Sequence, residues 1–183
     1  MKYYKTKIRF ITEYLQARFS EDAKAELENY MSKGIVKTPE EAYKTFLFQD
    51  ATGIYIPALQ IRNSLKNAGK EFKEKKKRSS MKQWVISNIV IQPSNIYIGK
   101  TEPDDVITSF PLRKDGTRVV AKHPSFNIGL EVEFFIKILD DDMEDIAIEK
   151  LVKEAGKTYG IGARRVDMYG RFELVEFNSV KSI

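Results

Sequence analysis

The stretch from residue 129 to residue 139 constrains the fold most, because apolar and polar side chains alternate along most of it. Its apolar set recurs at every second position: Leu130, Val132, Phe134, Ile136 and Ile138. A period of two is typical of a strand with one buried side and one solvent-facing side. Residues 5–16 alternate in the same way, with Ile8 and Phe10 on the apolar side and lysines and an arginine on the other. Both stretches are therefore predicted to be strands covered on one face.

Two further stretches have the spacing of amphipathic helices. From residue 58 the apolar residues recur at intervals of three and four: Ala58, Ile61, Leu65, Ala68 and Phe72. The opposite side of this helix carries a second stripe, which we call the basic ridge: Arg62, Lys66, Lys70, Lys73 and Lys77. Near residue 150 a second apolar stripe appears: Ile148, Leu151, Val152 and Ala155. Each apolar stripe is typical of a helix packed on a sheet.

The remaining segments complete the order of elements. Residues 53–57 predict a turn leading into the first helix, and the apolar residues 84–91 predict a buried strand. Residues 171–177 predict the last strand, followed by a loose tail over 178–183.

The resulting order is strand, helix, strand, strand, helix, strand. It predicts an α+β, ferredoxin-like (βαββαβ) fold: an antiparallel sheet with two helices on one face and the other face free to bind. Two additions are expected within a single domain over residues 1–183. One is a helical insertion at about 20–47, and the other is a basic hairpin at about 110–122.

Composition limits the class of protein. The 183 residues contain 31 Lys and Arg against 26 Asp and Glu, a net charge of +5, which is too small to prove a polyanionic partner by itself. The absence of cysteine excludes disulfides and thiolate metal sites. No signal peptide and no apolar run of about 20 residues is visible. We therefore expect a soluble cytoplasmic protein with no membrane partner.

A glycine- and arginine-rich loop lies between the second predicted helix and the last strand. Its candidate nucleic-acid contacts are Gly160, Gly162, Arg164, Arg165, Tyr169 and Gly170. Glycine permits positive φ and close backbone approach, arginine offers a planar cation for phosphate, and tyrosine offers a stacking surface for a base. The alternative is a helix C-cap followed by a turn, which needs glycine but not paired arginines.

The basic ridge and the basic hairpin are candidate phosphate contacts too. The cations of the hairpin are Arg113, Lys114, Arg118 and Lys122. Each phosphate that such a side chain neutralises releases counterions and makes affinity sensitive to salt. The alternatives are a solvated helix face and a plain surface hairpin.

His123 is the only histidine and the one weak catalytic candidate. A metal-independent ribonuclease needs a general base and a cation near the scissile phosphate, and His123 beside Lys122 offers both. The alternative is an ordinary loop histidine. Residues 140–142 are aspartates that could hold a divalent cation, but capping of the next helix explains them better, so we expect neither metal nor cofactor.

Two stretches resemble one known family, the RAMP superfamily of RNA-binding proteins in CRISPR effector complexes. Residues 53–65 are similar to its segment G-x-YIP-x-x-x-hR-x-x-L. The loop is similar to its signature G-h-G-x5-G-h-G, with Gly160-Ile161-Gly162 at the start and Tyr169-Gly170 at the end. Met168 stands where the signature has its third glycine.

The resemblance implies ferredoxin-like structure and RNA binding, mainly through the RNA backbone. The resemblance implies no particular member of the family, and we expect a non-catalytic, backbone-type subunit that holds RNA, or another single-stranded nucleic acid, in a nucleoprotein assembly with other subunits or with itself. A branch of the family cleaves RNA without metal, so a metal-independent endoribonuclease is the first alternative. The second is a relative from a virus or mobile element that serves as a structural or inhibitory protein and binds a protein partner.

Overall fold

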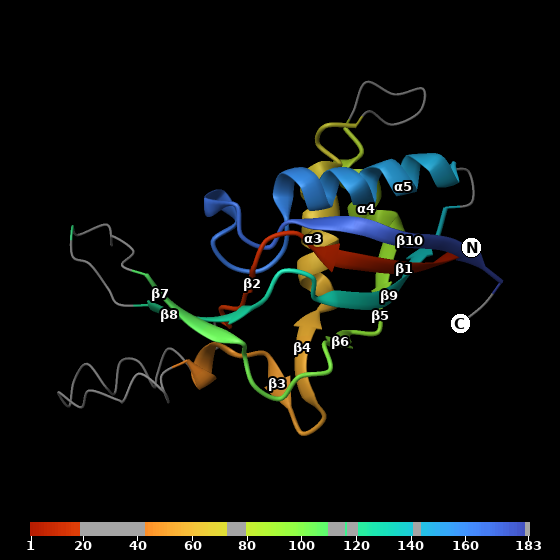
Figure 1. Cartoon of the computed structure of the whole chain (residues 1–183). Coiled ribbons are helices and arrows are strands. Elements are labelled where there is room, and N and C mark those ends of the chain that lie inside the picture. The colour runs from red at the N-terminus through yellow and green to blue at the C-terminus, as the bar shows by residue number, and fades with distance from the viewer. Residues whose placement is uncertain (19–42, 73–79, 110–115, 117–120, 141–143, 182–183) are drawn as a thin grey trace.

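Four strands form the largest sheet of the computed structural model, which describes residues 1–18, 43–72, 80–109, 116, 121–140 and 144–181 (Figure 1). The sheet has the order β10-β1-β9-β5, and every neighbouring pair is antiparallel. Its strands are β1 (Lys2–Phe10), β5 (Ile89–Gln92), β9 (Glu131–Ile138) and β10 (Phe172–Val180). The chain is therefore α+β. Its first strand, β1, lies inside the sheet, and its last strand, β10, pairs with β1 at the edge.

The alternation seen in the sequence decides which face of this sheet is buried. On β9 the predicted residues Val132, Phe134, Ile136 and Ile138 are all buried. On β1 the buried residues are Tyr4, Thr6, Ile8 and Phe10. The predicted strand over 129–139 is confirmed. The strand predicted over 5–16 begins earlier and ends at Phe10, after which the chain turns and forms the short strand β2.

Two helices cover the apolar face. They are α3 (Ala58–Ala68) and α5 (Asp145–Glu154), and α5 continues as the π-helical turn η2 (Ala155–Tyr159). Their inward stripes, with Ile61 and Leu65 on α3 and Leu151 on α5, belong to the same buried cluster as β1 and β9. Ser64 Oγ donates to the Ala155 carbonyl at 3.3 Å, which joins α3 to η2.

Shorter elements surround this unit. One three-stranded sheet has the order β2-β8-β7, and another has the order β3-β4-β6. The bounds are β2 (Tyr14–Leu15), β3 (Gln49–Asp50), β4 (Gly53–Pro57), β6 (Asn95–Tyr97), β7 (Asp105–Ser109), β8 (Ala121–Phe126), α4 (Lys82–Asn88), η1 (Lys44–Phe46) and η3 (Arg165–Asp167). No helix among the described residues is both long and apolar enough to span a membrane.

Three predicted elements are wrong in type or extent. Residues 53–57 form strand β4 rather than a turn, because they pair with both β3 and β6. Residues 84–91 were predicted as a strand, but Lys82–Asn88 is the helix α4 and only the end of the segment enters β5. A short apolar run does not distinguish a buried helix from a strand. The tail is not loose over its first part, because β10 pairs with β1 as far as Val180.

Other predictions fall wholly or partly outside the described residues. Of the helical insertion at about 20–47, only the part from residue 43 onward is described, and it includes η1. The basic hairpin has its paired arms in β7 and β8, with Ser109 opposite Ala121. Residues 110–115 and 117–120 between these arms are not described. Capping by 140–142 is wrong, since Glu144 occupies the N-cap of α5; Asp140 instead accepts a hydrogen bond from Trp84 Nε1 at 2.8 Å.

The sheet face opposite the helices is lined with ion pairs. Arg9 on β1 contacts Glu131 at 2.6 Å and Glu173 at 3.3 Å. Lys5 contacts Glu133 at 3.0 Å, and Lys7 lies 3.5 Å from Glu131. Each of these outward-facing cations of β1 thus has a glutamate on a neighbouring strand, whereas Lys2 contacts Asp145 of α5 at 3.0 Å on the helix side of the sheet. This face is therefore largely neutralised by its own charges.

These ion pairs predict a pH-dependent contribution to stability. The hydrogen bond from Arg9 and the positive charges around it hold the pKa of Glu131 below its ordinary value of 4.5. A carboxylate whose pKa is lower in the folded state stabilises that state above its unfolded pKa, and the effect is lost as the pH falls through the folded pKa. We expect Glu131→Gln to lower the melting temperature at about pH 7 and to have little effect at about pH 3.

Thermal unfolding followed by circular dichroism over this pH range checks the prediction. Glu13→Gln is the control, because the Glu13 carboxylate forms no ion pair with a described residue. A Glu131→Gln deficit that stays constant down to acidic pH would contradict the assignment.

Candidate nucleic-acid interface

The segment from Gly160 to Gly170, which we call the glycine loop, connects η2 to β10 and is closed at its base by its own backbone. The Ile161 amide donates to the Gly170 carbonyl at 3.0 Å, and the Ile161 side chain is buried in the core. Two more bonds attach the loop to the chain after β1: Gly170 N donates to Glu13 O and Ala163 N donates to Leu15 O, each at 2.8 Å. Figure 1 shows the loop in blue beside β2. These bonds fix the base of the loop to the rest of the domain.

The glycines are required by these close backbone contacts. Gly160, Gly162 and Gly170 all have positive φ. A Cβ on Gly170 would lie 1.8 Å from the Ile161 carbonyl oxygen, and one on Gly162 would lie 2.4 Å from the Leu15 carbonyl oxygen. Gly160 also serves as the C-cap of η2. The C-cap alternative therefore accounts for the first glycine, while the other two are explained by backbone packing.

Met168 has the conformation that glycine would adopt at its position. Its φ is +70°, and Arg164 has a φ of +52°, so left-handed residues stand on both sides of η3. Such a conformation costs an ordinary residue roughly 1–2 kcal/mol. The departure from the glycine signature is thus a change of side chain without a change of backbone. The Met168 carbonyl accepts a hydrogen bond from Thr12 Oγ1 at 2.9 Å, which helps to hold it.

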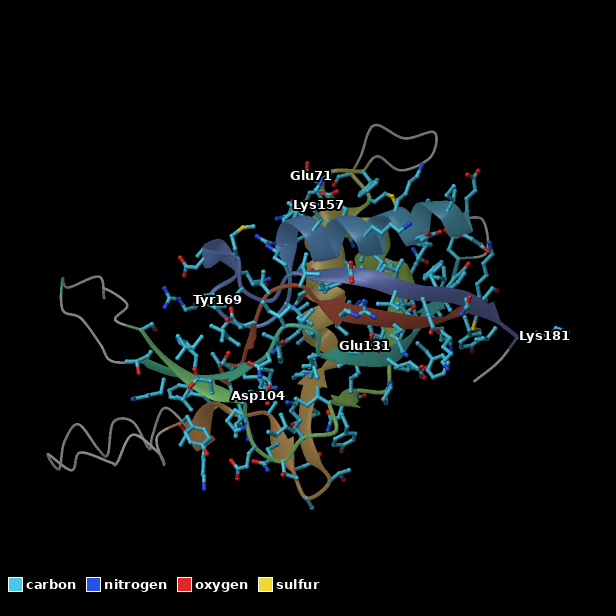
Figure 2. All side chains as sticks on the ribbon, in the orientation of Figure 1. Glu71, Asp104, Glu131, Lys157, Tyr169 and Lys181 are labelled. Carbon is cyan, nitrogen blue, oxygen red and sulfur yellow. The ribbon has the colours of Figure 1, made fainter. Side chains whose placement is uncertain are left out.

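The side chains of the loop tip combine charge with exposed apolar surface. Arg164 Nε donates to Asp167 Oδ2 at 2.8 Å, so its charge is partly neutralised. Arg165 is exposed and forms no ion pair with a described residue. Val166 is 93% exposed and Met168 is 58% exposed. Tyr169 is half-buried, and Figure 2 shows it on the side of the molecule opposite Lys181.

The β7–β8 hairpin lies next to the segment that anchors the glycine loop. Leu15, which accepts the Ala163 bond, pairs with Ser125 of β8. Lys122 and His123 are on the same strand and are half-buried. His123 Nε2 lies 3.0 Å from Ser109 Oγ on β7. The structure therefore brings two of the predicted contact regions, the loop and the hairpin, to one side of the domain; Arg113, Lys114 and Arg118 lie outside the described residues.

The environment of His123 disfavours its protonated form. Burial lowers the pKa of His123, the main chain of Gln16 acts in the opposite direction, and the positive charge of Arg164 lowers the pKa further. A lowered pKa leaves the imidazole neutral at about pH 7, the form that can accept a proton. The described residues contain no group of three or more carboxylate, histidine or cysteine side chains that could hold a metal ion.

The basic ridge is not a continuous helical stripe. The α3 helix ends at Ala68, before Lys70, and Lys73 and Lys77 lie outside the described residues. Arg62 is half-buried, and its Nη2 donates to the Ile86 carbonyl of α4. Lys66 Nζ donates to Asn63 Oδ1 at 3.1 Å. Glu71, the neighbour of Lys70 in the chain, accepts a hydrogen bond from the Tyr159 hydroxyl at 2.6 Å, and Figure 2 shows it away from Tyr169. Arg62 thus has a packing role between α3 and α4.

Arg171 is the residue that sequence reasoning left out of the site. It was predicted only as the first residue of the last strand, but the structure buries it, with 8% of its surface exposed. No sequence signal indicates this, since alternation with the buried Phe172 would direct it outward.

No protein-family model matches the sequence, and no curated protein matches it. The fold is nevertheless known. The chain shares it with subunits of CRISPR complexes. A chain in the cryo-EM structure of the type III-B Cmr-β complex bound to cognate target RNA aligns with a TM-score of 0.55 and 17% identity, covering 98% of this chain and 61% of that one. A chain of a type IV-B CRISPR complex aligns with a TM-score of 0.50 and 9% identity, covering 98% and 91%.

The close contact at the base of the glycine loop predicts a large effect of one methyl group. Gly170 and Gly99 both have a φ of +71°, but a Cβ on Gly99 would have nothing within 4 Å. Gly99→Ala should therefore cost only the conformational term, about 1 kcal/mol. Gly170→Ala should cost at least about 3 kcal/mol, because the Ile161 carbonyl must move as well. Denaturant unfolding of both variants measures the difference, and equal costs would contradict the packing argument.

Proposed function

We propose that this chain is an RNA-binding, non-catalytic subunit of a nucleoprotein assembly, built on a ferredoxin-like domain of the RAMP type and acting in the cytoplasm. The strand order β10-β1-β9-β5, with α3 before β5 and α5 before β10, supports the fold part of the proposal because a βαββαβ chain pairs its strands in this order. The shared fold with subunits of CRISPR complexes supports the assembly part.

The single observation that carries the proposal is the glycine loop. The base of the loop is held by the bond from Ile161 to Gly170 and by bonds to Glu13 and Leu15, so that the tip with the exposed Arg165 projects from fixed anchor points. A loop whose base is already ordered before binding loses less conformational entropy when it binds a ligand. Arginine on such a loop suits the phosphates of RNA, because its guanidinium can donate two parallel hydrogen bonds to phosphate oxygens.

The opposite sheet face does not suit the same task. Sheets that bind RNA on their open face stack bases on exposed aromatic rings. Here that face of β1 and β10 is occupied by the glutamate pairs of Lys5, Lys7 and Arg9. We therefore assign RNA to the side of the glycine loop and the β7–β8 hairpin. The proposed contacts there are Arg164, Arg165, Tyr169, Lys122 and the hairpin cations Arg113, Lys114 and Arg118, while Gly160, Gly162 and Gly170 shape the loop. The lysines of the basic ridge, Lys66, Lys70, Lys73 and Lys77, are proposed as additional, outlying phosphate contacts.

The loop arginines give the first test. The double substitution of Arg164 and Arg165 by alanine should weaken binding of a labelled single-stranded RNA by about tenfold or more. It should also reduce the slope of log affinity against log salt by about 1.4, from two contacts at about 0.7 each. Fluorescence anisotropy at a series of salt concentrations measures both quantities.

The matched control removes the same formal charge from the other side of the domain. Lys5 and Lys7, replaced together by alanine, should leave affinity close to that of the parent, because their charges are already neutralised by glutamates. An equal loss in both double variants would mean that only net charge matters. Unchanged affinity in the arginine variant would overturn the loop assignment, and a co-purifying protein without RNA would favour a structural or inhibitory role.

A second function is supported by the position of His123 on β8, where burial and the charge of Arg164 lower the pKa of the imidazole. A neutral imidazole can take the proton of an RNA 2′-hydroxyl, and a nearby guanidinium can stabilise the negative charge that forms on the phosphate. These are the parts of a metal-independent endoribonuclease.

Incubation of labelled RNA with the protein in EDTA tests this second function. If cleavage occurs, His123→Ala should abolish it, while Ser109→Ala should retain it, because Ser109 only contacts the imidazole. The rate should decline only below the ordinary histidine pKa of about 6.5, since the pKa of His123 is lowered and its base form persists to more acidic pH. Absence of cleavage by the parent protein removes this function.

A further inference from the structure

Arg171 is a buried cation at the end of the glycine loop with unused hydrogen-bonding capacity. Its Nη2 donates to the Arg165 carbonyl at 3.2 Å and lies 3.6 Å from Met168 Sδ. Its Nε and Nη1 are buried and have no hydrogen-bond partner within the described part of the chain. No carboxylate forms an ion pair with it among the described residues. The fold encloses a positive charge without an anion.

The environment of Arg171 differs from that of the buried Gln16 and from that of Arg9 on the sheet. Gln16 is fully buried, and both ends of its amide are bonded: Nε2 donates to the Tyr55 carbonyl, and Oε1 accepts from the Phe48 amide. Arg9 has two glutamates. The Nε atom of Arg62 is also unpartnered, but Arg62 donates to a carbonyl in the last turn of α4, the negative end of that helix. Arg171 contacts neither a carboxylate nor a helix C-terminus among the residues that the structure describes.

Arg165, whose carbonyl accepts the hydrogen bond from Arg171 Nη2, is itself a cation. Burial lowers the pKa of Arg171, and the positive charge of Arg165 lowers it further. An unpaired buried charge is costly, and a neighbour of the same sign increases that cost. An anion bound by both guanidinium groups would relieve both effects at once.

We propose that Arg171 and Arg165 together bind one phosphate group. The two groups that now occupy Nη2, the Arg165 carbonyl and Met168 Sδ, both belong to the tip of the loop. Displacement of this tip frees Nη2, so that Nη2 and an adjacent nitrogen of Arg171 can bind phosphate in the two-bond geometry that guanidinium favours. The tip is bounded by the left-handed residues Arg164 and Met168, whose conformations are the sparsely populated ones that a shift can relax.

The phosphate could be a phosphodiester of RNA or a free phosphate ion, and the chemistry of recognition is the same for both. The assignment to RNA rests on the function proposed above, whereas the site itself rests only on Arg171 and its surroundings. Two measurements separate these statements.

The first measurement uses inorganic phosphate and no RNA. Thermal unfolding is followed as phosphate replaces chloride at constant ionic strength. The melting temperature of the parent should rise by roughly 3–6 °C when phosphate is about tenfold above its dissociation constant. Arg171→Met keeps a long unbranched side chain without the charge, and it should lose this rise. Arg9→Met makes the same chemical change at a cation that has glutamate partners, and it should keep the rise.

A rise of equal size in Arg171→Met and in the parent overturns the site. If Arg171→Met fails to fold, Arg165→Met tests the site instead, because Arg165 is exposed and its replacement leaves the core intact. We expect Arg165→Met to reduce the phosphate-induced rise by at least half, and an undiminished rise in that variant overturns the pairing of the two arginines.

The second measurement uses single-stranded RNA. Arg171→Met, or Arg165→Met in its place, should lower the slope of log affinity against log salt by about 0.7, the value for one phosphate contact. A phosphate-induced rise in a protein that does not bind RNA supports the site and overturns the proposed function. RNA binding with no phosphate-induced rise supports the function and overturns the site.

Discussion

The backbone contact between Ile161 and Gly170 is the constraint on which the functional side of this domain depends. It closes the glycine loop directly before β10, and Gly170 then donates to Glu13 in the segment that follows β1. Arg171 continues the connection, because its carbonyl accepts from the Ile11 amide and its own amide donates to Thr12 Oγ1. The first and last strands of the sheet, the loop and β2 are thereby held in one arrangement. A side chain at Gly170 would separate these elements before it affected any ligand.

The positions of the charged side chains on this chain are more informative than its net charge. The outward cations of β1 lie within reach of glutamates on both neighbouring strands, which matches the rule that opposite charges on adjacent strands stabilise a sheet. The loop has the opposite character, with Arg165 exposed and Arg171 buried, and neither forms an ion pair with a described residue. A modest net charge of +5 therefore conceals one balanced face and one face with uncompensated cations.

Sequence reasoning succeeded where a long periodic pattern decides the structure. The alternation over 129–139 and the apolar spacing from Ala58 to Ala68 are each enforced by many buried side chains, and β9 and α3 follow them. It failed at 84–91, where Trp84 and Val85 are buried on a short helix whose identity depends on what packs against it. It also placed cations on a ridge that α3 does not extend far enough to form.

The candidate site was predictable in composition but not in geometry. The glycines and arginines of the loop were visible in the sequence, whereas its attachment to Leu15 joins residues nearly 150 positions apart, a long-range contact that no local pattern records. The burial of Arg171 is of the same kind, because it depends on the path of a loop that folds back over it.

Met168 shows how a signature residue can be replaced while its physical requirement is kept. The position demands a positive φ, and glycine meets this demand without strain. Methionine meets it at a conformational cost, and its thioether then lies 3.6 Å from Arg171 Nη2. Glycine would leave that nitrogen with the Arg165 carbonyl alone. Methionine at this position therefore adds backbone strain but supplies a polarizable thioether that contacts the buried Arg171 and can be displaced from it. Met168 thus belongs to the same proposed phosphate site as Arg171.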